Sequence, residues 1–224
     1  SDDALLDYAL DAFGRLGFDG VSLRALNREL AASPAMLGKR FGTKERLWLA
    51  AVDHGFHRHR QRLLAECGSL TQGTAVQRLE RFIEAFIRTA AQTPSLQRVI
   101  TIEGAQEGPR LEHLYREFIE PLMTGLVRPI LDEAIQDGAI DPIGDREVFF
   151  VVANGAASVA ALGPLSALFD GRDGTLEIRS YADNVARTLV RALRPGCRPE
   201  ALSTSGGSGY SRRQAHCRAC HNCS

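Results

Sequence analysis

Several absences narrow what this sequence can encode. It opens with Ser-Asp-Asp and lacks a basic segment followed by an apolar run, so no secretory signal is predicted. No apolar run reaches the length of a membrane span, and the longest, residues 148–163, contains Asn154 and Ser158. Lys plus Arg number 27, as do Asp plus Glu, so the net charge indicates no class of partner. We therefore expect a cytoplasmic protein that does not enter a membrane.

Cysteine is scarce in the body of the chain. There are five cysteines, and all but Cys67 lie within residues 197–224. This odd, uneven set does not fit the disulfide framework of a small secreted domain. No nucleophile elbow, phosphate-binding loop or catalytic pairing is visible, and the acidic residues between positions 103 and 120 are dispersed as on solvated faces. The sequence therefore predicts neither an enzyme nor a cofactor.

Helical periodicity runs through most of the chain to about residue 194. Apolar side chains recur every three or four residues, whereas no strand alternation and no repeat is visible. We predict an all-α fold of about nine helices, with helices over residues 3–16, 44–66, 74–92, 96–105, 110–137, 145–168 and 178–193 besides two short ones before residue 42. Ser95 is expected to cap a helix, and Pro121 and Pro129 to kink or split one. Residues 148–162 are apolar nearly all round, which predicts burial in a core or beneath a second copy.

Residues 21–49 have the pattern of two short helices joined by a tight turn. Ser22 is placed to cap the first helix, and Ser33 to cap the second, with Pro34 at its first position. Gly42 is expected to end the second helix and Thr43 to cap the next one. Two such short helices bury little apolar surface by themselves, so they need a third helix to pack against. This is the build of a helix-turn-helix DNA reader, whose second helix enters the major groove.

The order and spacing of residues 4–52 resemble those of TetR-type transcriptional regulators. The matching positions are Phe13, Gly17, Phe18, Ser22, Leu23, Arg24, Leu26, Ser33, Pro34, Leu37, Phe41, Gly42, Thr43, Lys44, Glu45 and Leu47. The resemblance implies a homodimer that binds a double-stranded DNA operator. It also implies a C-terminal helical domain that binds a small-molecule effector, with the last two helices forming a four-helix bundle between subunits.

Two positions depart from this family pattern. Gly38 stands where an aromatic residue is usual, and Asn27 where a small residue is usual. A glycine inside a helix costs about 1 kcal/mol relative to alanine. Asn27 faces inward by its spacing, so it needs a hydrogen-bond partner. Residues 22–46 carry six basic and two acidic side chains, a net charge of +4, which favours binding to phosphates.

The residues predicted to contact DNA lie on and around the second reader helix. They are Ser22, Arg24, Ser33, Pro34, Ala35, Met36, Gly38, Lys39, Arg40, Thr43 and Lys44. Lys39 and Arg40 can pair with guanine edges. The hydroxyl groups at helix N-termini suit phosphate oxygens, and plain capping is the alternative role for them. The predicted domains are a reader over residues 1–52, a ligand-binding and dimerisation domain over residues 53–194, and a flexible tail over residues 195–224.

The second domain is expected to hold a pocket for a mostly apolar effector. The candidate lining residues are Phe82, Phe86, His113, Phe118 and Asn154, with ordinary core packing as the alternative for the apolar ones. The polar half of the helix over residues 44–66 is interpreted as a solvated connector. Its three histidines, His54, His57 and His59, lack further ligands at metal spacing, so no metal is assigned there.

The tail carries a different kind of pattern. Cys217, Cys220, His221 and Cys223 have the spacing of ligands for zinc, copper(I) or part of an iron–sulfur cluster. The segment is terminal and has no core whose side chains would hold the ligands in place, so no metal is assigned. The preferred function is a repressor released from its operator by an effector. The alternatives are a metal- or redox-responsive DNA-binding sensor that uses the tail, and a helical carrier or enzyme with a vestigial reader, which Gly38 and Asn27 suggest.

Overall fold

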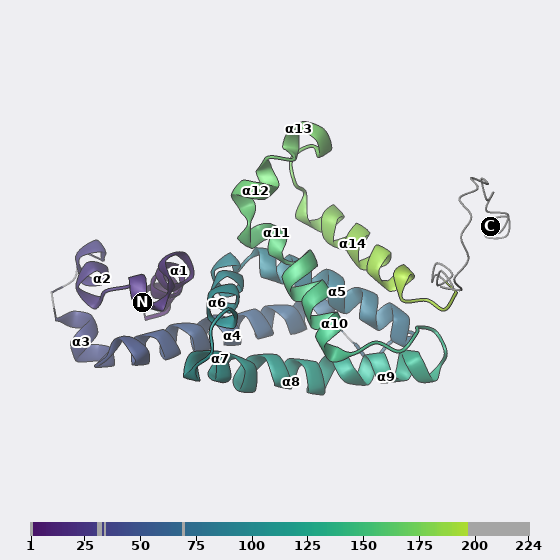
Figure 1. The fold of residues 1–224 in the computed structure, drawn as a ribbon, viewed down its shortest axis with the longest axis horizontal. Helices are drawn as coiled ribbons and strands as arrows, with labels where there is room; N and C mark the ends of the chain where they lie inside the picture. The colour runs from purple at the N-terminus through teal and green to yellow at the C-terminus, as the bar shows by residue number, and fades with distance from the viewer. Residues whose placement is uncertain (1, 31–32, 34, 69, 197–224) are drawn as a thin grey trace, which may run out of the picture.

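The protein is elongated and helical (Figure 1). The structure, a computed structural model, describes residues 2–30, 33, 35–68 and 70–196, and these contain no strand, which confirms the all-α prediction. At one end lie α1 (Asp2–Gly20), α2 (Leu23–Glu29) and α3 (Met36–Phe41), and α4 (Lys44–Cys67) runs from there into the rest of the molecule. Within the described residues no helix is both long and apolar enough to cross a membrane.

The remaining elements pack around the far half of α4. They are α5 (Ala75–Ala91), α6 (Pro94–Gly104), α7 (Pro109–Leu114), η1 (Tyr115–Ile119), α8 (Glu120–Leu122), η2 (Met123–Val127), α9 (Arg128–Gln136), α10 (Asp145–Phe149), η3 (Phe150–Ala156), α11 (Ser158–Ala161), α12 (Gly163–Ala167), α13 (Asp170–Asp173) and α14 (Ile178–Ala192), where η marks a π-helix.

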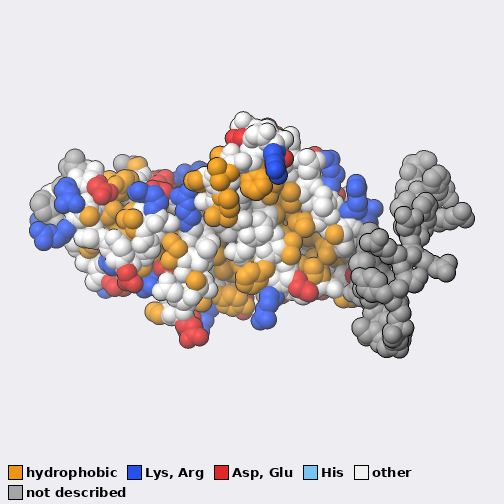
Figure 2. Space-filling view, turned by 45° about the horizontal axis from the view of Figure 1, so that its top comes forward, with side chains coloured by type: hydrophobic (Ala, Val, Ile, Leu, Met, Phe, Trp, Pro, Cys, Tyr) orange, Lys and Arg blue, Asp and Glu red, His pale blue; other side chains and the backbone are white. Residues whose placement is uncertain are grey.

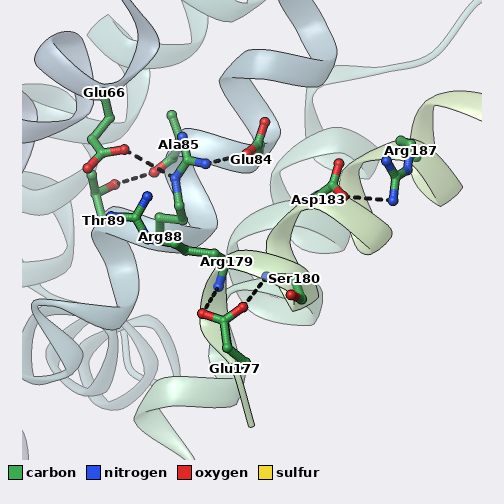
Figure 3. Close-up of polar contacts among 10 residues, drawn as sticks. All are labelled: Glu66, Glu84, Ala85, Arg88, Thr89, Glu177, Arg179, Ser180, Asp183 and Arg187. Carbon is green, nitrogen blue, oxygen red and sulfur yellow. Dashed lines mark hydrogen bonds and ion pairs between the residues drawn. The ribbon is translucent and has the colours of Figure 1, made fainter.

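Several predicted helix ends are present. Gly17 interrupts α1 with a φ of 68°, and Gly42 follows α3 with a φ of 79°, a region that favours glycine. The Thr43 hydroxyl accepts the Arg46 N–H at 3.2 Å at the start of α4. The carboxylate of Glu177 accepts two backbone N–H groups at the start of α14 (Figure 3).

The start of α3 differs from the prediction. The helix begins at Met36, after Ala35, rather than at Pro34, which lies outside the described residues. Ser33 accepts the Met36 N–H at 3.0 Å through its backbone carbonyl and not through its hydroxyl. Ser22 precedes α2, but its side chain forms no capping bond. Neither serine hydroxyl therefore caps its helix.

The prolines also act differently from the prediction. Residues 109–136 form one continuous helical rod, in which Pro121 and Pro129 each follow a π-helical turn. A proline lacks an N–H, and its ring crowds the carbonyl four residues earlier. A π-turn shifts hydrogen bonds to the fifth residue back, as in Glu120 N–H to Tyr115, so the wider turns accommodate both rings.

Two further predicted helix boundaries are corrected. Ser95 does not cap α6, because Pro94 already occupies the first turn after Thr93. The single helix expected over residues 145–168 is instead α10, η3, α11 and α12. It breaks at Leu162, just before Pro164 starts the first turn of α12.

The helices bury two apolar clusters. The first joins α1 to α4 around Phe13, Leu37 and Trp48, and it also takes side chains from α6 and α7. The second lies among α5, α9 and α14, and Leu63 of α4 belongs to it. Helix α4 thus contributes side chains to both clusters and connects them. The division into domains at residue 52 stays a prediction.

A polar cluster fixes α4 against α5. The Arg88 guanidinium donates to Glu66 of α4 at 3.1 Å and also to Glu84, one turn earlier on α5 (Figure 3). Thr89 lies beside it and donates its hydroxyl to the Ala85 carbonyl at 2.9 Å. The far half of α4 is therefore held to α5 by apolar packing and by these charge-assisted bonds.

Candidate nucleic-acid interface and ligand cavity

Helix α3 presents a cationic face to solvent. Leu37 is fully buried and anchors the helix, whereas Gly38, Lys39 and Arg40 are exposed. A Cβ added at Gly38 would meet nothing within 4 Å, so this face has open space at its centre. Lys and Arg side chains gather at this end of the molecule (Figure 2). A surface of this shape and charge can lie against a nucleic-acid backbone.

Most of the reader cations are free to meet a phosphate. Arg24, Arg28 and Lys39 are exposed and form no ion pair with other described residues. Arg40 pairs with Asp2, but the two side chains are 41% and 66% exposed. Such an exposed pair contributes about 1 kcal/mol or less, so a phosphate can displace Asp2.

The other predicted DNA contacts are distributed around this face. Ser22, Ser33, Ala35 and Thr43 are exposed, and Met36 is half-buried. The ammonium group of Lys44 lies 4.3 Å from the centre of the Phe18 ring in a cation–π contact. Lys44 is therefore held at the edge of the reader, beside the start of α4.

Asn27 forms the hydrogen bond that its inward spacing required. Its side chain is buried, and its Oδ1 accepts the backbone N–H of Leu37 at 3.1 Å. Leu37 is the second residue of α3, so this N–H is one of the first-turn donors that have no partner within the helix. Asn27 thus replaces the missing serine cap and joins α2 to α3. It sets the angle at which α3 faces outward.

We predict that Asn27→Ala lowers the free energy of unfolding by about 2 kcal/mol, because it leaves a buried N–H unpaired. Chemical denaturation measures this change. Gly38→Ala is the matched control on the same helix, and it should raise stability by up to about 1 kcal/mol, since the site is open and alanine is the better helix former. Equal stability of Asn27→Ala and the wild type would show that the bond does not hold the reader.

A cavity of about 520 Å³ lies along the far side of α4. Of the predicted pocket residues, the structure brings Phe86, His113 and Phe118 to its wall. Asn154 instead lines a second cavity of about 540 Å³, and Phe82 is buried in the core and lines neither. Ile100, Ile119 and Phe149 line both cavities and so separate them.

The prediction of a solvated connector in α4 is wrong for its inner face. Phe56, His59 and Leu63 line the first cavity. Together with Val52 and Cys67 they recur at helical spacing, so His59 belongs to an apolar stripe that begins in the reader core. The apolar stripe is visible in the sequence, but the charged residues between its members favoured the interpretation of a solvated helix. Gln97 of α6, also missed, lines the same cavity.

His59 is a neutral, half-buried histidine. Its Nδ1 lies 3.1 Å from the Thr93 hydroxyl, which donates its own proton to the Thr89 carbonyl. Because the Thr89 carbonyl can only accept, this arrangement favours the His59 tautomer that carries its proton on Nδ1 and donates to Thr93. Burial, reinforced by the nearby charge of Arg62, lowers the pKa of His59 from 6.5 to about 4.

We predict that this histidine destabilises the protein in acid. Its pKa is lowered on folding, so the unfolded chain takes up the proton first as the pH falls. Stability from this group is complete above pH 6.5 and declines until about pH 4, with a loss on the order of 3 kcal/mol. Denaturant unfolding at pH 7 and pH 4 measures it. His59→Gln, which can still donate to Thr93, should lose less stability over this interval; an identical loss in both proteins would contradict the assignment.

Contacts at the centre of α4 connect the cavity wall to the reader core. Asp53 pairs with His113 of α7 at 2.7 Å, and Phe56 stacks on Phe118 of η1 with ring centres 4.2 Å apart. The His113 ring in turn lies edge-on to Trp48, at 6.2 Å between centres. Movement of the rod over residues 109–136 would thus be passed directly to α4 and to the single tryptophan.

A strip of apolar side chains is exposed on elements that project from the middle of the molecule (Figure 1). It follows η3 to α13 and is formed by Phe150, Val151, Leu162, Leu165, Leu168 and Phe169. Hydrophobic side chains gather over this region (Figure 2). Of residues 148–162, Val148, Val152 and Ala156 are buried in the core, whereas Phe150, Val151 and Leu162 are exposed in the single chain, and cover by a second copy stays a prediction for them.

The described residues contain no group of three His, Cys, Asp or Glu side chains placed to hold a metal ion. The candidate tail ligands Cys217, Cys220, His221 and Cys223 lie outside the described residues.

Solved structures with this architecture identify the fold. A TetR-family regulatory protein from Rhodococcus RHA1 superposes with a TM-score of 0.68 at 18% sequence identity, covering 86% of this chain and 96% of that one. For the TetR-family transcriptional regulator PfmR from Thermus thermophilus, the TM-score is 0.58 at 18% identity, with 84% and 97% covered. The hemolysin II transcriptional regulator HlyIIR gives 0.57 at 17% identity, with 85% and 96% covered. No protein-family model and no curated protein matches the sequence. The chain has the fold of TetR-family regulators.

Proposed function

We propose that this protein is a sequence-specific DNA-binding transcription regulator, a repressor rather than an enzyme, whose α3 enters the major groove of an operator. The observation that carries this is the free cationic face of α3, held outward by the bond from Asn27 to Leu37. The two departures that suggested a vestigial reader are compatible with binding. Asn27 fixes the reader helix, and Gly38 leaves open space on the surface that would face the bases.

The exposed apolar strip and the sequence resemblance support action as a homodimer. Two readers related by a two-fold axis would meet two half-sites one helical turn apart, about 34 Å, on one face of the duplex. Helices α11 to α13 project from the middle of the molecule and α3 lies at one end (Figure 1), so a second copy can cover the strip while both α3 helices stay free. The near-palindromic operator predicted here follows from that symmetry.

The cavity along α4 supports release by a small molecule. Its wall includes Phe118 and His113, which contact Phe56 and Asp53 of α4. A ligand that binds one position of the rod over residues 109–136 better than another would shift α4, and with it the separation of the readers. This coupling supports the proposal that residues 1–52 bind DNA and residues 53–194 bind the ligand and the partner subunit.

The salt dependence of DNA binding tests the proposal. With about five phosphates neutralised by each subunit, log K against log salt should have a slope on the order of −9 for the dimer. The measurement uses the full chain and a duplex that the protein selects from a random-sequence pool, at several salt concentrations. A slope near zero, or failure to select any sequence, would contradict DNA binding.

A further inference from the structure

We propose that the cavity along α4 binds a neutral aromatic molecule that presents a hydrogen-bond donor, such as a phenolic hydroxyl, to two acceptors deep in the site, His59 Nε2 and Gln97 Oε1. The proposal rests on the proposed function only in that it names the chemical class of the effector. Its geometric basis is independent of DNA.

The walls of the cavity fit a flat apolar body. Phe56 and Phe118 stack on each other with nearly parallel rings, and Phe86 and Phe149 also line the space. Phe86 is held edge-on against the His59 ring, with ring centres 5.8 Å apart. Aromatic rings pack well against such offset and edge-on faces. At about 520 Å³, the cavity has the size of sites for drug-sized molecules.

The first acceptor is set by a chain of hydrogen bonds. The Thr93 hydroxyl lies 3.2 Å from the Thr89 carbonyl, which can only accept, and a Thr93 proton placed there favours donation from His59 Nδ1 to Thr93. A neutral imidazole protonated on Nδ1 has a lone pair on Nε2. No described residue forms a hydrogen bond to that Nε2, and the atom is not among the fully buried ones. His59 lines the cavity, so Nε2 is accessible to a ligand there. It can only accept.

The hydrogen bond formed by the Gln97 amide nitrogen identifies the second acceptor as the amide oxygen. Gln97 is only 5% exposed, and its Nε2 donates to the Ala153 carbonyl at 2.7 Å. That carbonyl cannot donate, so the amide oxygen must be the other atom, Oε1. Oε1 has no partner among the described residues and is likewise open to the cavity. An amide oxygen that faces the cavity can accept a hydrogen bond from a ligand donor.

The charged groups of the cavity do not favour a charged ligand. Asp53 shares its carboxylate with His113, and Arg60 and Glu117 are exposed residues of opposite charge. Solvated charges of both signs cancel at short range and contribute little to binding. Because His59 and Gln97 are less exposed than Arg60 and Glu117, hydrogen-bond donation rather than charge should select the ligand.

A matched pair of probes tests the proposal. 4-Phenylphenol and its methyl ether, 4-methoxybiphenyl, share the biphenyl body, and the ether replaces the hydroxyl donor by a methoxy group, so the phenol should bind the full-length protein at least about 10-fold more tightly. Binding is read from the fluorescence of Trp48, the single tryptophan, which lies beside His113. His59→Phe and Gln97→Met should each reduce the preference toward unity. Asn154→Leu, in the second cavity, should leave it unchanged.

Each outcome decides the matter. Equal binding of the two probes, or no binding of either, overturns the proposed ligand chemistry even if the protein binds its operator normally. A preference that survives both cavity variants overturns the assignment to these two acceptors. Preference for the phenol without any operator binding leaves the ligand chemistry standing and refutes only the proposed function, so the two failures are distinguishable.

Discussion

Replacing Lys39 and Arg40 together by alanine is expected to reduce affinity for the selected operator about 1,000-fold. Both side chains are exposed on α3, and each can reach a base edge or a phosphate. A good contact to a base contributes about 1–3 kcal/mol, and two subunits supply four such contacts. A loss on the order of 4 kcal/mol corresponds to that change in Kd. Fluorescence anisotropy with a labelled duplex at fixed salt measures it.

The matched control variant removes two positive charges from the surface outside α3. Arg116 and Arg191 are exposed and lie far from α3 in the sequence, so Arg116→Ala with Arg191→Ala should change operator affinity by less than about 3-fold. Circular dichroism should show the same helix content in both double variants, because all four side chains are on the surface. Undiminished operator binding by the Lys39 and Arg40 variant would remove α3 from the interface.

The second large effect concerns the apolar strip. Val151→Asp with Leu162→Asp is expected to convert the dimer into folded monomers and to weaken operator binding at least about 100-fold. The two side chains are 46% and 51% exposed in the single chain and line neither cavity, so the subunit itself should stay folded. Burying two carboxylates against a second copy is costly, and unlinked readers lose the gain of binding two half-sites at once.

Sedimentation measures the oligomeric state, and the same anisotropy assay measures affinity. The control is Leu16→Asp, an equally exposed apolar position on α1 at the reader end, which should remain dimeric. If the double variant still sediments as a dimer, the strip is not the subunit interface. If it becomes monomeric but keeps full affinity, the operator does not require two linked readers.

The reader was predictable because its signals are local. Gly17, Gly42 and Thr43 act within one helical turn of their own positions, where a positive φ or a single capping bond decides the structure. The start of α3 was not predictable in this way. Asn27, ten residues before Leu37, supplies the missing first-turn acceptor, and only the folded turn brings the two together.

The cavity was harder to predict because its residues come from distant segments. His59, Gln97 and Phe118 meet only when α4, α6 and η1 pack, and each segment alone is typical of an ordinary amphipathic helix. The predicted alternative of a split at Pro121 and Pro129 does not occur, for a related reason. Local chemistry says that a proline disrupts an α-helix, whereas a π-turn just before it lets the rod continue.

The most direct test of the central claim places a DNA-cleaving group on α3 itself. Gly38→Cys, coupled to an iron chelate, offers an exposed thiol in open space at the middle of the reader face. Cys67 can stay, because burial raises the pKa of its thiol to about 11 and keeps it unreactive. The tail cysteines are replaced by serine: Cys197, Cys217, Cys220 and Cys223.

We expect two clusters of cleavage on the selected duplex, both in the major groove and related by the two-fold axis of the operator, about one helical turn apart. The same chelate on Ser180→Cys, at the start of α14, should give no localised cleavage. Scattered cleavage from position 38, or cleavage confined to the minor groove, would contradict the claim that α3 reads DNA.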